Sequence, residues 1–384
     1  MKVPIAIAFV FSCFVLFSCS KSSSPPNSGT SKIDSTPLPG TISQTDTLRV
    51  MAYNVLSYGD ACQGPTSTLD AYLNTIVQYT APDLMSCEKI NAFPFTPGAV
   101  GNLGDELLAN ALNLESPNKY NYAAPTNATN LDKMSVLFYN QQKLAYVATE
   151  NLLSLGSDFD FYKLYYKDVN LPITKDTTFL FVLVCHTKSG SSSTERDYQD
   201  SAVISTLRTK FSYFPNLIIM GDFNTTGSYE KGYQSIINSK DSTTKMSDPP
   251  YYPDQLIKYP GDWNTIPDYV AHYLTTSTRS LPDVPNSCGT SAGGKGWYDH
   301  IFISPWLVNG TNYIQYVSKS YQSVGNDGAR LGVSINSDVP VINTSAPSTV
   351  LDALFQFSDK YPVMINLTVK ANRNAVSPKD PMEK

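Results

Sequence analysis

Polar residues able to bind a metal ion or a phosphate group end several apolar runs of strand length. Asn54, Glu88 and His186 each end such a run, and Asp222 with Asn224 ends a fourth. Residues two apart in extended chain point to the same side, so Asp222 and Asn224 present a carboxylate and an amide together. This pair is able to orient a water molecule and to hydrogen-bond a phosphate oxygen without excess negative charge. The chemistry indicated is metal-assisted hydrolysis of a phosphate ester.

Each of these residues also has a structural interpretation when it is taken alone. Asn residues such as Asn54 often form turns at the ends of strands. A Glu at the end of a strand, such as Glu88, is usually exposed to solvent or held in an ion pair. Residues 221–224 read equally as a simple β-turn, and His186 as a core histidine with satisfied hydrogen bonds. His300 follows an acid that opens a strand and points to the opposite face, where a structural role is expected.

The elements that must position these residues alternate between strands and helices. Runs rich in Val, Ile, Leu, Phe and Tyr predict strands over residues 47–54, 83–88, 133–139, 178–186, 216–223, 297–304 and 361–370. Apolar residues at helical spacing predict helices over residues 68–79, 104–112 and 196–211. Strands buried on both faces and separated by helices indicate an α/β layered domain. Functional groups in such folds gather at strand ends.

Composition limits the classes of protein that this chain can be. Its 384 residues carry a formal net charge of −5, and clustered Lys and Arg are not evident, which argues against a high-affinity, non-specific nucleic-acid binder. Residues 225–296 are rich in loops and predict surface connections near the site. Within them, the Tyr-rich stretch 250–275 is suited either to stacking on sugars or bases or to packing.

The first residues carry the pattern of a secretory signal peptide. Lys2 precedes an apolar run over residues 5–17, which is too short for a comfortable membrane span. The closing Leu-x-Ser-Cys resembles a bacterial lipobox and makes Cys19 the expected lipidated residue, with an ordinary cleaved signal peptide as the alternative. We expect a signal peptide over 1–19, a disordered Ser/Pro-rich tether over 20–45, one folded domain over 46–372 and a polar tail over 373–384. The expected location is the bacterial cell envelope, with membrane contact through the lipid anchor.

Four further cysteines fall into two groups. Cys87 and Cys185 lie inside strand-like runs and are predicted to be buried small hydrophobes. Cys62 and Cys288 lie in loop-like sequence, so that in an oxidising compartment they either form a disulfide or remain free thiols.

The ordered set of motifs resembles the endonuclease/exonuclease/phosphatase superfamily, which is also called DNase I-like. The motifs are an Asn in the first strand, a Glu ending the next, His-x-Lys, Gly-Asp-Phe-Asn, Trp-x-Asp-x-Ile-x-x-Ser and Ser-Asp-x-x-Pro-Val. The resemblance extends from about residue 46 to residue 370. It implies a four-layer α/β/β/α sandwich of two mixed sheets flanked by helices.

The resemblance also implies a role for each matched residue. Glu88 is the expected principal metal ligand, assisted by Asn54 and Asp359. Asp222 is expected to orient the attacking water, and Asn224 to hold that water or the scissile phosphate. The remaining expected catalytic residues are His186, which contacts the phosphate, and Asp299, which supports the closing motif. Arg196 and Gln199 match positions on the helix after the His186 strand, without a catalytic role.

The chain departs from the superfamily pattern at Lys360, where the closing Ser-Asp-His motif has its histidine. An amine with a reference pKa of about 10.4 replaces an imidazole that accepts a proton near neutral pH. Beside Asp299 and Asp359 the lysine should stay protonated. It cannot then act as a base, but it is able to form an ion pair with Asp299 or to bind a substrate phosphate.

The expected cofactor is Mg²⁺ or Mn²⁺, because a ligand set of carboxylates and amides suits a hard cation, whereas zinc favours His and Cys. The partner implied is a phosphate-ester substrate, either nucleic acid, nucleotide, sugar phosphate or phospholipid, and the protein is expected to be a monomer. The function predicted is a lipid-anchored phosphodiesterase or phosphatase weakened or retuned by Lys360. The alternative is an inactive binding or structural lipoprotein that keeps the fold.

Overall fold

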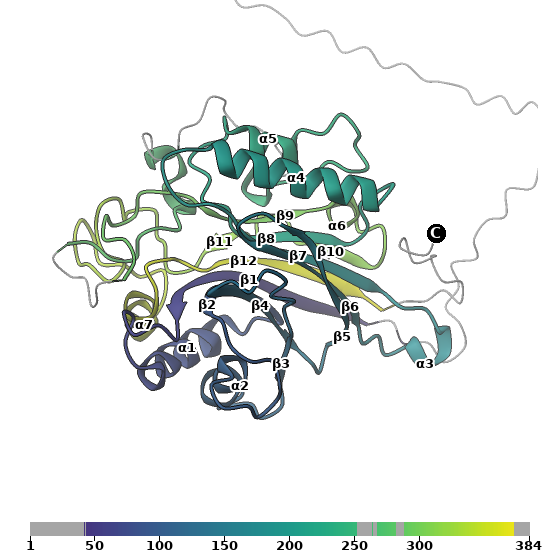
Figure 1. Ribbon diagram of the computed structural model, residues 1–384, viewed down its shortest axis with the longest axis horizontal. Coiled ribbons are helices and arrows are strands. Elements are labelled where there is room, and N and C mark those ends of the chain that lie inside the picture. The colour runs from purple at the N-terminus through teal and green to yellow at the C-terminus, as the bar shows by residue number, and fades with distance from the viewer. Residues whose placement is uncertain (1–41, 43, 252–262, 264–266, 282–287, 372–384) are drawn as a thin grey trace, which may run out of the picture. The chain divides into compact units, whose positions relative to one another are not determined.

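The computed structural model describes residues 42, 44–251, 263, 267–281 and 288–371. Two β-sheets pack face to face within this part of the chain, and helices cover both outer faces (Figure 1). The expected four-layer α/β/β/α sandwich is therefore confirmed. No helix in the described ranges is long and apolar enough to cross a membrane.

The first sheet is mixed and has β1 near its centre. Its order is β10-β12-β1-β2-β4-β3, with β11 also paired to β12. β1 is parallel to β2 and antiparallel to β12. The strands are β1 (Thr45–Tyr58), β2 (Leu84–Asn91), β3 (Tyr120–Ala123), β4 (Lys133–Asn140), β10 (Ile314–Tyr316), β11 (Gln322–Ser323) and β12 (Val363–Lys370).

The second sheet has the order β5-β6-β7-β8-β9, in which only β7 and β8 are parallel. Its strands are β5 (Leu144–Ser154), β6 (Asp158–Tyr166), β7 (Phe179–His186), β8 (Leu217–Asp222) and β9 (Asp299–Ile303). A central core lies between the sheets. Because side chains alternate along a strand, β1 directs Leu48, Val50 and Ala52 into this core and Met51 and Tyr53 to the outer face.

Helices complete the two outer cores. α1 (Thr66–Thr80), α2 (Leu103–Leu107) with its π-helical continuation (Leu108–Leu112), and α7 (Ser348–Phe357) pack on the first sheet. α4 (Thr194–Lys210) and α5 (Lys231–Ile237) pack on the second sheet. The short helices α3 (Leu171–Thr174) and α6 (Pro305–Asn309) follow β6 and β9. The seven strands and three helices predicted from the sequence all form.

The predicted loop-rich region 225–296 lies partly outside the residues that the structure describes. α5 and two short 3₁₀ segments (Pro249–Tyr251 and Pro267–Tyr273) lie within it. Of the Tyr-rich stretch 250–275, residues 252–262 and 264–266 lie outside what the structure describes.

Candidate active site

The sheet registers bring most of the predicted site residues to one end of the sandwich. Asn54 is directly paired with Glu88 at the ends of β1 and β2. In the second sheet, Asp222 is paired with His186 on one side and with Asp299 on the other. Residues from six segments separated widely in sequence thus meet where the strands end.

Asp222 is the most connected residue of this group. Its Oδ2 accepts a hydrogen bond from Asn54 Nδ2 at 2.8 Å and lies 3.2 Å from Lys360 Nζ. Its Oδ1 accepts the backbone N–H of Asn224 at 2.9 Å. Burial alone would raise the pKa of this carboxyl, but Lys360, His186 and these hydrogen bonds outweigh burial and hold it below its usual value. Asp222 is therefore ionised.

Lys360 forms its ion pair with Asp222 and not with Asp299, so the predicted partner was wrong. The reason is tertiary: the first and second sheets converge here, and the lysine that leads into β12 reaches the end of β8. Its Nζ also lies 4.6 Å from the centre of the Tyr298 ring, a cation–π contact. Burial favours a lower pKa, but the carboxylates of Asp222, Asp299 and Asp359 raise it above its usual value, which favours the protonated form that the sequence predicts.

Glu88 differs from Asp222 because neither of its carboxylate oxygens has a hydrogen-bond partner of regular geometry, although the side chain is fully buried. Burial, reinforced by the charge of Asp222, raises its pKa to about 8 against the opposing influence of Ser86 and Lys360. A buried carboxylate without partners is costly unless a cation or proton compensates its charge. These properties suit a residue that ligates a cation.

Asp299 and Asp359 complete the acidic set. Both oxygens of Asp299 lack a partner of regular geometry, and burial together with the charge of Asp222 holds the pKa of Asp299 well above its usual value. Asp359 Oδ2 accepts hydrogen bonds from the N–H and hydroxyl of Thr290 at 2.7 and 3.0 Å, while its Oδ1 is buried without a partner. Thr290 carried no signal in the sequence, because its contact depends on a loop crossing the site.

The expected metal set fits the structure in part. Asn54 Oδ1 already accepts the N–H of Leu56 at 3.0 Å, and its Nδ2 orients Asp222. In the described part of the chain, no three His, Cys, Asp or Glu side chains form a group that could by itself hold a metal ion. Mg²⁺, however, commonly uses one or two carboxylates and completes its shell with water and substrate oxygens. The unpartnered oxygens of Glu88 fit that mode of binding.

His186 ends β7, and Asn224 lies two residues after the end of β8, the strand paired with β7. Asn224 Nδ2 donates to the backbone oxygen of Thr187 at 3.0 Å, which fixes the loop after β7. Burial lowers the pKa of His186, so its imidazole is neutral. His186 also lines a cleft of about 260 Å³ between the two sheets. The other lining residues are Pro125, Asn127, Leu131, Asp132, Lys133, Met134, Ser135, Gly156, Ser157, Asp158 and Asp160.

Three residues that the sequence singled out without a catalytic role stabilise the fold. Arg196 forms a buried ion pair with Glu230, at 2.6 Å between Nη2 and Oε1. Gln199 accepts the backbone N–H of Lys188 and donates to the backbone oxygen of Leu155. His300 is fully buried among aromatic rings.

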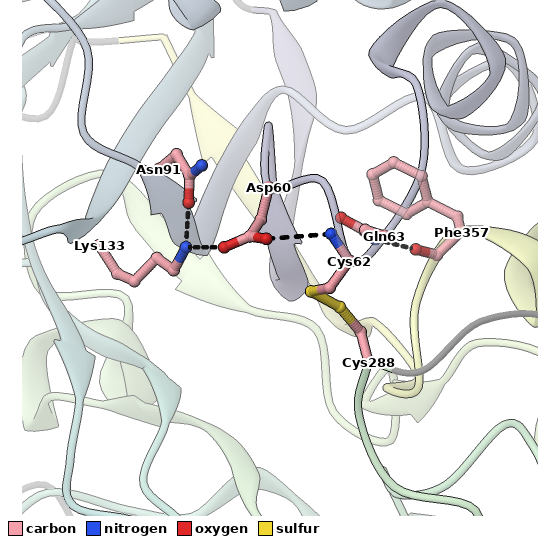
Figure 2. Close-up of a disulfide and its surroundings, with 7 residues drawn as sticks. All are labelled: Asp60, Cys62, Gln63, Asn91, Lys133, Cys288 and Phe357. Carbon is pink, nitrogen blue, oxygen red and sulfur yellow. Dashed lines mark hydrogen bonds and ion pairs between the residues drawn. A yellow bond between two sulfur atoms is a disulfide. The ribbon is translucent and has the colours of Figure 1, made fainter.

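A disulfide between Cys62 and Cys288 is formed, which resolves the alternative that the sequence left open (Figure 2). Cys87 and Cys185 are buried free thiols, as predicted. The disulfide ties the loop after β1 to the segment that supplies Thr290, two residues beyond Cys288. On the other side, Gln63 Nε2 donates to the backbone oxygen of Phe357 at 2.5 Å. Both linked loops thus contact the 357–359 segment, which leads into Lys360.

Two packed mixed sheets with polar residues gathered at one end give the four-layer α/β/β/α sandwich that the resemblance implies. No protein-family model matches the chain, and no curated protein matches it significantly in sequence.

Solved structures with similar folds include the following three proteins. One is an endonuclease/exonuclease/phosphatase family protein from Bacteroides thetaiotaomicron, with 14% identity, a TM-score of 0.48, and coverage of 85% of this chain and 97% of that chain. The human Nocturnin catalytic domain has 13% identity, a TM-score of 0.47, and coverage of 87% and 98%. A Bacteroides thetaiotaomicron mannosyl-6-phosphatase has 14% identity, a TM-score of 0.46, and coverage of 83% and 99%.

Proposed function

We propose that this protein is a lipid-anchored, Mg²⁺- or Mn²⁺-dependent hydrolase of phosphate esters. The observation that carries the proposal is the position of Glu88, a buried carboxylate without a hydrogen bond of regular geometry, directly beside Asn54 and near ionised Asp222. When bound, the cation would polarise a phosphoryl oxygen and stabilise the leaving oxygen. Glu88 would hold it, with Asp359 and Asn54 as the supporting oxygen donors.

The chain's own residues would position the reactants. A carboxylate has about four lone-pair sites, and three donors occupy Asp222, so one site remains to orient a water molecule. The neutral imidazole of His186 would hydrogen-bond the phosphate at the edge of the cleft. Lys360 would stabilise negative charge as a cation, because its raised pKa prevents it from accepting a proton.

The cleft beside His186 favours substrates whose alcohol part carries no further phosphate. Asp132, Asp158 and Asp160 line it, and the one lining lysine, Lys133, already pairs with Asp60 at 2.8 Å. A second phosphate in this cleft would therefore face uncompensated negative charge. A volume of about 260 Å³ also lies below the usual range for drug-sized ligands of about 300–1,000 Å³.

A second candidate function is that of a binding or structural lipoprotein without turnover. The ion pair between Lys360 and Asp222 favours it, because the lysine supplies a resident positive charge and no base is available at that position. A screen of nucleic acids, nucleotides, sugar phosphates and phospholipids with Mg²⁺ or EDTA separates the two candidates. Mg²⁺-dependent release of phosphate or alcohol, lost on Glu88→Gln, supports the enzyme; binding without turnover across the screen supports the alternative.

A further inference from the structure

A surface of mixed apolar and basic character lies around α3, at the end of the sandwich away from α7 (Figure 1). Three large apolar side chains are exposed here, Ile42 at 54%, Val169 at 43% and Ile173 at 45%. Two exposed lysines, Lys167 and Lys175, flank them. These five residues are called the α3 surface below.

The exposed charges of the α3 surface are those of Lys167 and Lys175, whereas the neighbouring acidic residues are buried. Asp168 and Asp176 are 4% and 0% exposed, and Asp168 Oδ1 accepts the backbone N–H of Asn170 at 2.7 Å. Lys167 and Lys175 also line a shallow hollow of about 480 Å³, together with Tyr165, Asp168, Leu171 and Pro172. Exposed apolar side chains flanked by lysines are the composition that binds the interface of an anionic bilayer.

The path of the chain brings its N-terminal segment to the same place. The N–H of Ile42 donates to Asn170 Oδ1 at 2.6 Å, and Asn170 Nδ2 donates to the oxygen of Ile42 at 2.7 Å. The residues before Ile42, which include the expected lipidation site Cys19, therefore join the folded domain beside α3. The chain that leads to the expected lipidation site therefore leaves the described domain at the α3 surface.

A second exposed apolar stretch has the wrong charge for such a role. Val339, Val341 and Ile342 are 52–66% exposed, but Asp338 precedes them. Residues 331–359 contain no Lys or Arg. An anionic surface would repel this stretch and attract the α3 surface.

We propose that the α3 surface docks on the headgroup region of an anionic membrane, with Val169 and Ile173 inserted and Lys167 and Lys175 at the lipid headgroups. This orientation directs the candidate active site away from the bilayer. Asn54 lies nine residues along β1 from Thr45, which corresponds to roughly 30 Å at about 3.3 Å per residue. The catalytic end would then meet soluble esters and not the phospholipids of the membrane that holds the protein. The docking surface itself does not depend on the proposed hydrolase activity.

The test is lysine footprinting of the full protein with an amine-reactive reagent and mass spectrometry. The protein is compared in phosphatidylglycerol-containing vesicles, in phosphatidylcholine vesicles and in detergent. We expect several-fold lower labelling of Lys167 and Lys175 on the anionic vesicles alone, reversed by high salt. Lys188, at the catalytic end, and Lys240, after α5, are exposed internal controls whose labelling should not change.

Two variants sharpen the result. Val169→Ser with Ile173→Ser should restore labelling of the two lysines on anionic vesicles, with an unchanged melting temperature. Lys167→Gln with Lys175→Gln should shift the ratio of docked to undocked protein by on the order of thirtyfold, since each lysine near an anionic surface contributes about fivefold. Equal labelling in all three media would overturn the proposal. Protection that persists in detergent would also overturn it, because another segment of the chain would then cover the surface. Protection that grows with protein concentration would point to a second copy of the protein, and protection of Lys188 would point to a different orientation; both outcomes contradict the proposal.

Discussion

Lys360 Nζ lies 3.2 Å from Asp222 Oδ2, and both side chains are less than 10% exposed. The pair joins the lead-in to β12 in the first sheet to the end of β8 in the second sheet. It places a fixed positive charge among four buried acids, so that the site holds a resident cation at the position where the resembled superfamily has a histidine.

Replacing Lys360 with His should raise phosphate-ester hydrolysis. The imidazole can accept a proton near neutral pH, and a general base contributes roughly 10²–10⁴-fold. Initial rates with Mg²⁺ for the wild type and Lys360→His provide the measurement. Lys360→Met serves as the control, because it removes the ammonium without adding a base, and it should lose about 3 kcal/mol of unfolding free energy by leaving Asp222 with an uncompensated charge. Strong native turnover that falls in Lys360→His would instead make the lysine a functional replacement.

Glu88→Gln should abolish the stabilisation of the protein by divalent cations. A cation that binds only the folded state raises the melting temperature as its concentration exceeds Kd, and Glu88 supplies the two unpartnered buried oxygens. Melting temperatures over a Mg²⁺ and Mn²⁺ titration test this expectation. Glu115→Gln, at an exposed position, is the matched control. An equal shift in wild type and Glu88→Gln would remove Glu88 from the metal site.

In EDTA, Glu88 should make the protein less stable as the pH rises. Its pKa of about 8 in the folded state exceeds its usual value of 4.5, so between these values the folded state keeps a proton that the unfolded state has lost. The free energy of unfolding contributed by Glu88 therefore falls with rising pH through this window, by a few kcal/mol in all. Denaturant midpoints at about pH 5 and about pH 8 should differ less for Glu88→Gln than for the wild type. Parallel pH profiles would contradict the raised pKa.

Loss of the Cys62–Cys288 disulfide should weaken cation binding as well as stability. The bond closes a sequence separation of 226 residues, and removal of a native disulfide typically costs about 2–5 kcal/mol. Because the linked loops contact Asp359 and Phe357, Cys62→Ser with Cys288→Ser should also raise the Kd for Mg²⁺. Dithiothreitol should reproduce the effect in wild type and have no further effect in the variant. A lower melting temperature with an unchanged Kd would limit the bond to a role in stability.

Cys19→Ala should give unlipidated protein or an unprocessed precursor. The prediction follows from the Leu-x-Ser-Cys pattern after the apolar run. Partitioning into a detergent phase after extraction from cells measures it, with Cys87→Ala as a control for loss of a thiol that the lipid does not use. Unchanged partitioning of Cys19→Ala, together with an unchanged mass, would show that the chain is not lipidated at this residue.

The sequence alone determined the main strands, the helices α1, α2 and α4, and the layered architecture, but not the ten-residue helix α7. Val-, Ile- and Phe-rich runs such as β7 and β8 are buried on both faces, so their composition reports their environment directly. Short or partly exposed elements carried no such signal: β5 is half-buried or exposed beyond its first residue, and β11 has two residues. The sequence also identified the candidate site residues at strand ends, because a polar residue that follows an apolar run can be recognised from the sequence alone.

Tertiary structure alone decided which of those residues touch. Three contacts show this: Lys360 pairs with Asp222 and not with Asp299, Thr290 contacts Asp359, and Cys62 is bonded to Cys288. Each contact joins segments that are 69 to 226 residues apart in the sequence or that lie in different sheets. Their distances depend on sheet order, register and loop path, and local sequence carries none of these. The raised pKa of Glu88 has the same origin, because burial by surrounding elements causes it.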